Sequence, residues 1–164
     1  MPILPEHLVT LAERVVRENA ALGRTIALAE SCTGGLVAAA ITEVPGSSSV
    51  LDRGFVTYSN AAKQELLEVP EEVLDAFGAV SVATAWAMAQ GALKHSSADV
   101  AVAVSGIAGA GGGAGQRPGR AGGFSRALRG QDEEVDAEER RFAAETRADV
   151  RLQAALAALE LLLP

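Results

Sequence analysis

The segment AESCTGG, residues 29–35, gathers side chains that could attack or bind a substrate. It lies where the apolar run TIALAE ends and LVAAAITEV begins, so we expect a strand, a turn and a helix. The hydroxyls of Ser31 and Thr33 and the N–H groups of Gly34 and Gly35 would then meet at a helix N-terminus, which suits an anion or a developing oxyanion. The alternative is that Ser31 or Thr33 only caps the helix and the glycines only form the turn.

The segment TYSNAAK, residues 57–63, could supply the base that a serine nucleophile needs. A strand end followed by one helical turn would present Tyr58, Asn60 and Lys63 near one another. Burial can lower the pKa of a lysine enough for it to take a proton, so Lys63 is the candidate base. The alternative, which is commoner for helical lysines, is a solvated surface side chain.

Other nucleophiles and bases fit less well. His7 and His95 lie in amphipathic helical stretches with no carboxylate partner evident, so a Ser–His pair is not indicated. Cys32 stands beside Ser31, but no histidine pairs with it, and lone buried cysteines are usually inert. We therefore favour Ser31 as the nucleophile, with Ser48 of the PGSSS loop or a directly activated water as the next candidates.

A third motif, SGIAGAGGG at residues 105–113, follows the apolar stretch DVAVAV directly. Loops that follow a buried strand in this way often contact ligands in α/β proteins. The motif is not a P-loop, because Gly-Lys-Ser/Thr is missing, and it is not a convincing dinucleotide fingerprint. It predicts a binding loop in which Ser105, Gly106 and Gly109 are candidate contacts.

Length and composition place these motifs in one compact α/β domain, residues 1–164. Apolar residues make up 49% of the chain and aromatic residues only 4%, so alanine, valine and leucine must fill the core, as in helix-on-sheet packing. Strands are expected at 25–30, 50–58 and 99–104, with an edge strand at 133–142, and helices at 5–22, 36–44, 61–69, 70–78, 82–96 and 145–163.

Charge and cysteine content limit the partners. The chain has 14 Lys plus Arg against 21 Asp plus Glu, a net charge of −7, and no lysine-rich run, so nucleic acid is not expected. A single cysteine and two histidines predict neither a disulfide framework nor the usual kind of metal site. No basic leader or membrane-spanning apolar run is present, so we expect no membrane partner and a cytoplasmic protein. A small phosphorylated ligand is compatible with this charge, since one arginine and a few N–H groups can bind one phosphate.

The motifs AESCTGG, PGSSSVLDRGFVTYSNAAK and AVAVSGIAGAGGG, with EERRFAAETRADVR near the end, together resemble the signature of the CinA C-terminal domain family, also called nicotinamide-nucleotide amidohydrolase. The resemblance implies a single three-layer α/β/α sandwich with a mixed central sheet. It implies hydrolysis of the carboxamide of nicotinamide mononucleotide to nicotinate mononucleotide and ammonia, without a metal or cofactor. It also implies a homodimer.

The resemblance assigns roles to particular residues. Ser31 matches the family's proposed nucleophile, Lys63 its base, and Tyr58 a residue that assists them. Ser105 stands where the family commonly has threonine, and Arg147 matches an arginine that meets the charged part of the substrate. With the motif analysis, the predicted substrate contacts are Thr33, Gly34, Gly35, Ser48, Asn60, Ser105, Gly106, Gly109 and Arg147.

In the implied mechanism, Lys63 takes the proton of Ser31, and N–H groups near residues 33–35 stabilise the oxyanion. A non-catalytic nucleotide-binding or competence and DNA-damage accessory module is the alternative from another functional class. Such a module predicts that Ser31 and Lys63 lie apart or exposed, whereas catalysis needs them within hydrogen-bond reach in a pocket. An amidase for another pyridine nucleotide or a small amide is a third reading.

Residues 114–130 depart from the family pattern. The family continues with Pro-Val-Gly and an apolar strand, whereas GRAGGFSRALRG, residues 119–130, is polar, glycine-rich and a poor strand, so we expect a core strand to be missing. Codons for these residues, read one base later, could give Val-Gly-Leu-Val-Val-Phe-His-Val, which resembles the expected strand. We therefore consider a local reading-frame alteration over residues 119–129, with a genuine disordered loop as the alternative.

Overall fold

The computed structural model describes residues 3–106, 121–131, 136–143 and 146–164. Its strands are β1 (Ile26–Glu30), β2 (Leu51–Val56), β3 (Val100–Gly106), β4 (Ala121–Leu128) and β5 (Asp136–Arg141). Its helices are α1 (Glu6–Ala21), α2 (Leu36–Thr42), α3 (Asn60–Leu67), α4 (Glu71–Phe77), α5 (Val82–Lys94) and α6 (Arg147–Leu161), with a short 3-10 turn, η1 (Ser47–Ser49).

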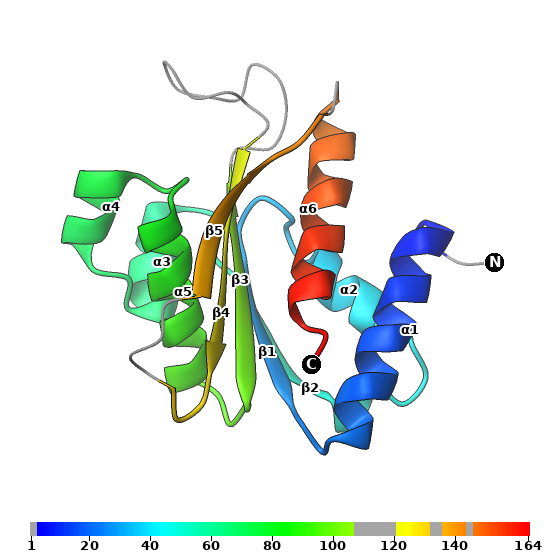
Figure 1. The fold of residues 1–164 in the computed structure, drawn as a ribbon. Helices are drawn as coiled ribbons and strands as arrows, with labels where there is room; N and C mark the ends of the chain where they lie inside the picture. The colour runs from blue at the N-terminus through cyan, green and yellow to red at the C-terminus, as the bar shows by residue number, and fades with distance from the viewer. Residues whose placement is uncertain (1–2, 107–120, 132–135, 144–145) are drawn as a thin grey trace.

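The strands form one sheet in the order β2-β1-β3-β4-β5, which lies between two layers of helices (Figure 1). Strands β1, β2 and β3 run parallel, whereas β4 and β5 are antiparallel to their neighbours. Helices α1, α2 and α6 cover one face, and α3, α4 and α5 cover the other (Figure 1). The predicted mixed α/β sandwich is confirmed.

Alternating side chains on β1 and β3 divide the core into two parts. Ile26 and Leu28, with the valines of β3, pack against α1, α2 and α6. Ala27 and Ala29, with the alanines of β3, pack on the side of α3, α4 and α5. Because successive side chains of a strand point to opposite faces, the apolar runs read from the sequence fill both cores at once.

The parallel strands bring three polar segments to one edge of the sheet. Glu30 at the end of β1 pairs with Val56 of β2 on one side and with Val104 of β3 on the other. The residues that follow these positions, Ser31, Thr57 and Ser105, therefore lie at the same carboxyl edge, where α/β sheets usually bind ligands.

The segment that was expected to lack a core strand forms one. Residues 121–128 are β4, which pairs antiparallel with β3 on one side and with β5 on the other. The predictions of a missing strand and of a disordered loop are therefore wrong for these residues, while residues 114–120 lie outside the described part. The strand removes the structural reason for supposing a reading-frame alteration, which gene resequencing and peptide mass mapping would test directly.

Close packing explains why a glycine-rich segment occupies the sheet interior. A Cβ atom at Gly123 would lie only 2.7 Å from the carbonyl oxygen of Ser81, at the start of α5. The next residue, Phe124, is fully buried and packs edge-on against Phe142, with ring centroids 6.0 Å apart. Strand propensity is low for glycine, but here the close approach of α5 requires the absence of a side chain.

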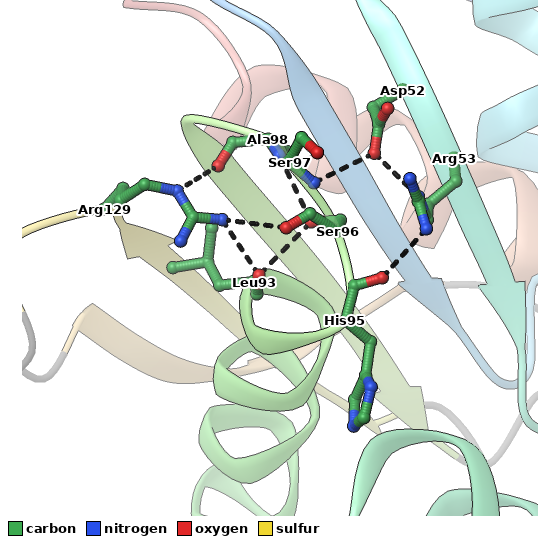
Figure 2. A network of polar contacts seen from close by, with 8 residues as sticks. All are labelled: Asp52, Arg53, Leu93, His95, Ser96, Ser97, Ala98 and Arg129. Atoms are coloured by element: carbon green, nitrogen blue, oxygen red, sulfur yellow. Dashed lines mark hydrogen bonds and ion pairs between the residues drawn. The ribbon is translucent and has the colours of Figure 1, made fainter.

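Arg129 connects the end of β4 to the end of α5 (Figure 2). Its guanidinium donates hydrogen bonds to the carbonyl oxygens of Leu93, Ser96 and Ala98, at 2.9, 3.2 and 2.7 Å. Leu93 lies in the last turn of α5, whereas Ser96 and Ala98 belong to the segment between α5 and β3, so Arg129 fixes the end of the helix and the following connection relative to β4. The segment around β4 is thus joined to its surroundings by specific contacts.

The expected edge strand at 133–142 is observed as β5 over residues 136–141, and residues 133–135 lie outside the described part. β5 is the last strand of the sheet, and Arg126 of β4 forms an ion pair with Asp136 of β5 at 3.0 Å. Charged side chains along an edge strand discourage pairing with other chains. The acidic and basic residues of this strand are therefore compatible with its position at the edge.

The close packing at Gly123 leads to a stability prediction. Gly123→Ala should lower the free energy of unfolding by roughly 1–3 kcal/mol, because the added methyl group meets the Ser81 carbonyl. Gly54→Ala in β2 is the matched control, since a Cβ there has no neighbour closer than 3.7 Å. Urea denaturation of the two variants measures the difference, and equal effects would contradict the packing explanation.

Candidate functional site

Ser31 is the first residue after β1 and is held firmly at the carboxyl edge of the sheet. Its backbone N–H donates to the Val104 carbonyl oxygen at 3.0 Å, which extends the pairing of β1 with β3 by one residue. The residue is only 7% exposed. A nucleophile at this position would therefore be well oriented and largely shielded from bulk water.

Lys63 of α3 is completely buried and reaches Ser31. Its Nζ lies 3.0 Å from Ser31 Oγ, 2.8 Å from the Thr57 carbonyl oxygen and 3.0 Å from the Tyr58 carbonyl oxygen. Within the described part of the chain, no carboxylate forms an ion pair with this amine. The alternative of a solvated surface lysine is therefore wrong.

Burial lowers the pKa of Lys63 from 10.5 to about 8, because the charged ammonium loses its hydration. A neutral amine has two hydrogens and one lone pair. If the carbonyl oxygens of Thr57 and Tyr58 accept the two hydrogens, the lone pair is left for the third contact, the Ser31 hydroxyl. The arrangement can thus accept the serine proton, as a general base must.

Tyr58 contacts this pair through its backbone carbonyl oxygen, while its side chain is largely exposed. The residue is 62% exposed, and its hydroxyl accepts a hydrogen bond of 3.0 Å from Nη2 of Arg147, the first residue of α6. Two segments far apart in the sequence therefore meet beside the Ser31–Lys63 pair. Asn60, at the start of α3, is exposed.

The predicted contacts after β3 are placed only in part. Ser105 is buried, and its hydroxyl donates a short hydrogen bond to the Ala79 carbonyl oxygen in the segment before α5. Gly106 ends β3 and pairs with Gly122 of β4. Gly109 lies outside the described residues. Substrate binding by these residues stays a prediction.

Ser48 and His95 lie at the opposite end of the sheet from Ser31. Ser48 belongs to η1, which precedes β2, whereas Ser31 follows the parallel strand β1, so Ser48 is not brought to Ser31 within one chain and its substrate contact stays a prediction. His95 follows α5, and its carbonyl oxygen accepts from Arg53 in the network of Figure 2. The expectation that it has no carboxylate partner is also wrong, because its Nε2 contacts Glu68. This pair is nevertheless too far along the sheet to serve Ser31.

Glu30 is the residue of the AESCTGG motif to which the sequence assigned no role. It is buried, 1% exposed, and its carboxylate accepts four hydrogen bonds. Oε1 accepts from the Thr33 hydroxyl at 2.6 Å, from the Gly35 N–H at 3.2 Å and from the Val37 N–H at 3.0 Å. Oε2 accepts from the Ala38 N–H at 3.0 Å. The positive end of α2 is therefore neutralised by a side chain of the protein itself.

This arrangement corrects the predicted oxyanion site. The Gly34 N–H donates to the Ser31 carbonyl oxygen at 3.0 Å, and the Gly35 N–H donates to Glu30. Neither group is free for an oxyanion, so the prediction is wrong for these two N–H groups. Gly34 and Gly35 have φ values of +59° and +100°, which explains why glycine occupies both positions.

Arg151 of α6 contacts the other side of the same turn and was also missed from the sequence. Its Nε donates to the Cys32 carbonyl oxygen at 3.1 Å, and its Nη2 donates to the Thr33 carbonyl oxygen at 3.2 Å. The spacing of Arg147 and Arg151 was the available signal, because residues four apart share one face of a helix. For Glu30, the signal was a carboxylate just before a helix N-terminus.

Cys32 does not compete with Ser31 as a nucleophile. It is a free, buried thiol, and burial raises its pKa from 9.0 to about 11. Because the thiolate is the reactive form, a thiol with this pKa is inert near neutral pH. Cys32 is therefore a poor nucleophile, and the choice of Ser31 stays a prediction.

The described residues contain no group of three or more His, Cys, Asp or Glu side chains that could hold a metal ion. Among the described helices, none combines the length and the apolar character that crossing a membrane would need.

Sequence comparison identifies relatives over nearly the whole chain. A family model described as the CinA C-terminal domain matches residues 8–164. The nicotinamide-nucleotide amidohydrolase PncC of Enterobacter agglomerans is 49% identical over 153 residues, which cover 92% of each protein. A putative competence-damage inducible protein of Symbiobacterium thermophilum is 62% identical over 109 residues, which cover 66% of this chain but only 26% of that longer protein.

Solved structures show the same fold. The competence/damage inducible protein CihA from Agrobacterium tumefaciens superposes with a TM-score of 0.92 at 46% identity, covering 99% of this chain and 97% of that one. A CinA superfamily protein from Klebsiella pneumoniae gives a TM-score of 0.88 at 36% identity, covering 94% of both chains. The comparisons therefore support the predicted resemblance and the predicted amidohydrolase class.

The burial of Lys63 predicts its titration. In protein labelled with 13C-lysine, Lys63 and Lys94 give the only lysine signals, since the chain has no other lysine. The Lys63 Cε signal should titrate with a midpoint near 8, the ammonium form disappearing as the pH rises through this value. Lys94→Arg assigns the two signals, and a Lys63 midpoint near the ordinary ~10.4 would contradict the buried site.

Proposed function

Because the chain belongs to the CinA C-terminal domain family, we propose that it hydrolyses the carboxamide of nicotinamide mononucleotide to nicotinate mononucleotide and ammonia. The name of the Enterobacter relative supports this reaction and substrate. Within the chain itself, the contact of 3.0 Å between Ser31 Oγ and the buried Lys63 amine carries the proposal. This contact is what a serine nucleophile and its base require.

In the first half of the proposed reaction, neutral Lys63 takes the hydroxyl proton of Ser31 while Ser31 Oγ forms a bond to the carboxamide carbon. The resulting ammonium of Lys63 then returns the proton to the amide nitrogen. The carbon–nitrogen bond breaks, ammonia leaves, and an acyl ester on Ser31 remains. Roughly one molecule in ten has a neutral Lys63 at pH 7 if the pKa is about 8.

In the second half, neutral Lys63 takes a proton from water, and the hydroxide oxygen attacks the ester carbon. The ester bond breaks, Ser31 recovers a proton from Lys63, and the acid is released. The same amine thus serves as base and then as acid in both halves, which requires a pKa near the working pH. The lowered pKa of Lys63 supports this double role.

In the proposed mechanism, a hydrogen-bond donor other than the N–H groups of Gly34 and Gly35 stabilises the oxyanion. In the described part of the chain, the Thr33 N–H, two residues after Ser31, has no acceptor, and we propose it as one donor. A backbone N–H in a fixed turn is already oriented before the reaction, which makes it effective for developing charge.

Arg147 is the proposed anchor for the substrate phosphate. It is exposed at the start of α6, where it donates to the Tyr58 hydroxyl. Arg151, one turn further along, already donates to two carbonyl oxygens of the nucleophile turn. A phosphate dianion needs a charge-assisted partner, and Arg147 is positioned to provide it.

The alternative functions differ in the contacts that they require between Ser31 and Lys63 and in the substrates that they would accept. A non-catalytic accessory module does not need contact between Ser31 and Lys63, so their contact and the lowered pKa of Lys63 favour catalysis. An amidase for another pyridine nucleotide would use the same chemistry, and a panel of nicotinamide, its riboside, its mononucleotide and NAD distinguishes these substrates. The homodimer and the cytoplasmic location stay predictions.

The Ser–Lys mechanism predicts strong and non-additive losses. Ser31→Ala and Lys63→Ala should each reduce ammonia release from nicotinamide mononucleotide by more than about 1,000-fold, and the double variant should be scarcely worse, because the residues act as one unit. Lys63→Arg should not recover activity, since guanidinium stays protonated. In the unmodified protein, kcat/KM should rise with pH along one ionisation near 8.

Lys94→Ala is the control, because Lys94 is an exposed lysine paired with Glu68 far from Ser31. It should retain full activity. Near-normal rates for folded Lys63→Ala would refute the mechanism, and near-normal rates for Ser31→Ala would move the nucleophile elsewhere.

Arg147 predicts an effect on binding that depends on the phosphate. Arg147→Ala should raise KM for nicotinamide mononucleotide by about 10- to 100-fold with little change in kcat, the loss expected for one charge-assisted hydrogen bond. Nicotinamide riboside, which lacks the phosphate, is the control substrate. An equal loss of kcat/KM with the riboside would show that Arg147 does not bind the phosphate.

A further inference from the structure

We propose that Glu30 is a positioning residue, whose buried carboxylate holds the turn of residues 31–35 so that Ser31 Oγ stays against Lys63. The kinetic part of this inference rests on the proposed function, whereas its structural part does not. Glu30 would act through Ser31 and would not touch the substrate.

The carboxylate of Glu30 joins the turn to the helix that follows it. Its donors come from the turn, through Thr33 and Gly35, and from the first turn of α2, through Val37 and Ala38. A carboxylate removed from water needs such donors on both oxygens, because an unpaired buried charge is unstable. The turn and the helix are therefore locked in one relative position.

The backbone of Glu30 connects the same residue to the base. Its carbonyl oxygen accepts from the Thr57 N–H at 2.8 Å, and the Thr57 carbonyl oxygen accepts from Lys63 Nζ at 2.8 Å. Ser31 follows Glu30 directly in the chain. Glu30 thus lies between the nucleophile and the strand end that holds the base, so a shift of Glu30 changes the distance between Ser31 and Lys63.

Arg151 holds the same turn as Glu30, but it binds hydrogen-bond acceptors of the turn, whereas Glu30 binds donors. Glu30 accepts from N–H and O–H donors, whereas Arg151 donates to the carbonyl oxygens of Cys32 and Thr33. A Cβ atom at Gly34 would lie 3.4 Å from Arg151 Nη2, so the guanidinium packs directly on the turn. The turn is held from the sheet side by a carboxylate and from α6 by a guanidinium.

Direct participation of Glu30 in chemistry is disfavoured by its surroundings. It is 1% exposed, and its oxygens are occupied by four donors of the protein. A buried group whose oxygens are both engaged by the protein is poorly placed to take a proton from a substrate or a water molecule. Positioning is the role that these contacts support.

Cys32 offers a measurement that does not depend on activity. It is the only cysteine of the chain, it lies within the turn, and it is 6% exposed, so its reaction with Ellman's reagent reports opening of the turn. Glu30→Gln keeps the size of the side chain but turns an NH2 donor toward backbone N–H donors. It should accelerate modification of Cys32 at least 10-fold at a fixed pH, and Arg151→Met should accelerate it about threefold.

The kinetic measurement separates positioning from stability. Glu30→Gln should lower kcat at least 10-fold while KM for nicotinamide mononucleotide changes less than threefold. The matched control is Asn19→Ala, since Asn19 is fully buried and donates to the Val15 and Leu162 carbonyl oxygens on the α1–α6 side. It should lower Tm without changing kcat or the Cys32 reaction.

Unchanged Cys32 reactivity in folded Glu30→Gln, or the same loss of kcat in Asn19→Ala at equal loss of Tm, would overturn the proposal. If Glu30→Gln does not fold, Thr33→Val removes only the hydroxyl donor of 2.6 Å and should still accelerate the Cys32 reaction; no acceleration would then count against the role of Glu30. If the unmodified protein does not hydrolyse the nucleotide, the proposed function fails, while the Cys32 measurement still decides whether Glu30 holds the turn.

Discussion

A buried amine, enclosed by two carbonyl oxygens and one hydroxyl and paired with no carboxylate among the described residues, is the constraint on which the carboxyl edge of this sheet depends. Lys63 has lost its water, and no carboxylate in the described part of the chain pairs with it, so its pKa falls to about 8 and the neutral form becomes accessible near neutral pH. The same contacts orient the amine, because Thr57 and Tyr58 supply the acceptors for its hydrogens and leave Ser31 as the third neighbour. The lowered pKa of Lys63 and the orientation of its amine therefore have the same cause, which is the set of groups that enclose it.

The groups around this amine come from separated parts of the chain. Ser31 directly follows β1, Thr57 lies between β2 and α3, and Lys63 belongs to α3. Arg151 comes from α6 and is more than a hundred residues from the turn that it contacts. Parallel strands bring Ser31 and Thr57 together because their carboxyl ends share an edge. Arg151 arrives because α6 packs on the face of the sheet that α2 also covers.

The antiparallel half of the sheet, strands β4 and β5, also makes contacts near this edge. β4 pairs with β3 along its length, and Gly123 allows the start of α5 to approach β4 closely. Ser105 donates to the segment before α5, so β3, β4 and α5 are joined near the site. At the opposite end, Arg129 joins β4 to the end of α5. The charged and glycine-rich residues of this region thus have structural roles that strand propensity does not describe.

The sequence by itself determined the α/β class, the order of most elements and the candidates Ser31 and Lys63, because hydrophobic periodicity, caps and short motifs are local properties. Tertiary structure decided the rest. Only packing showed that β4 forms despite its glycines and that Ser48 lies at the far end of the sheet. Only three-dimensional contacts showed that Glu30 accepts from the Gly35 N–H and that Arg151 donates to the carbonyl oxygens of Cys32 and Thr33. Burial and hydrogen bonding between distant segments depend on where the whole chain places them, and no local pattern contains that information.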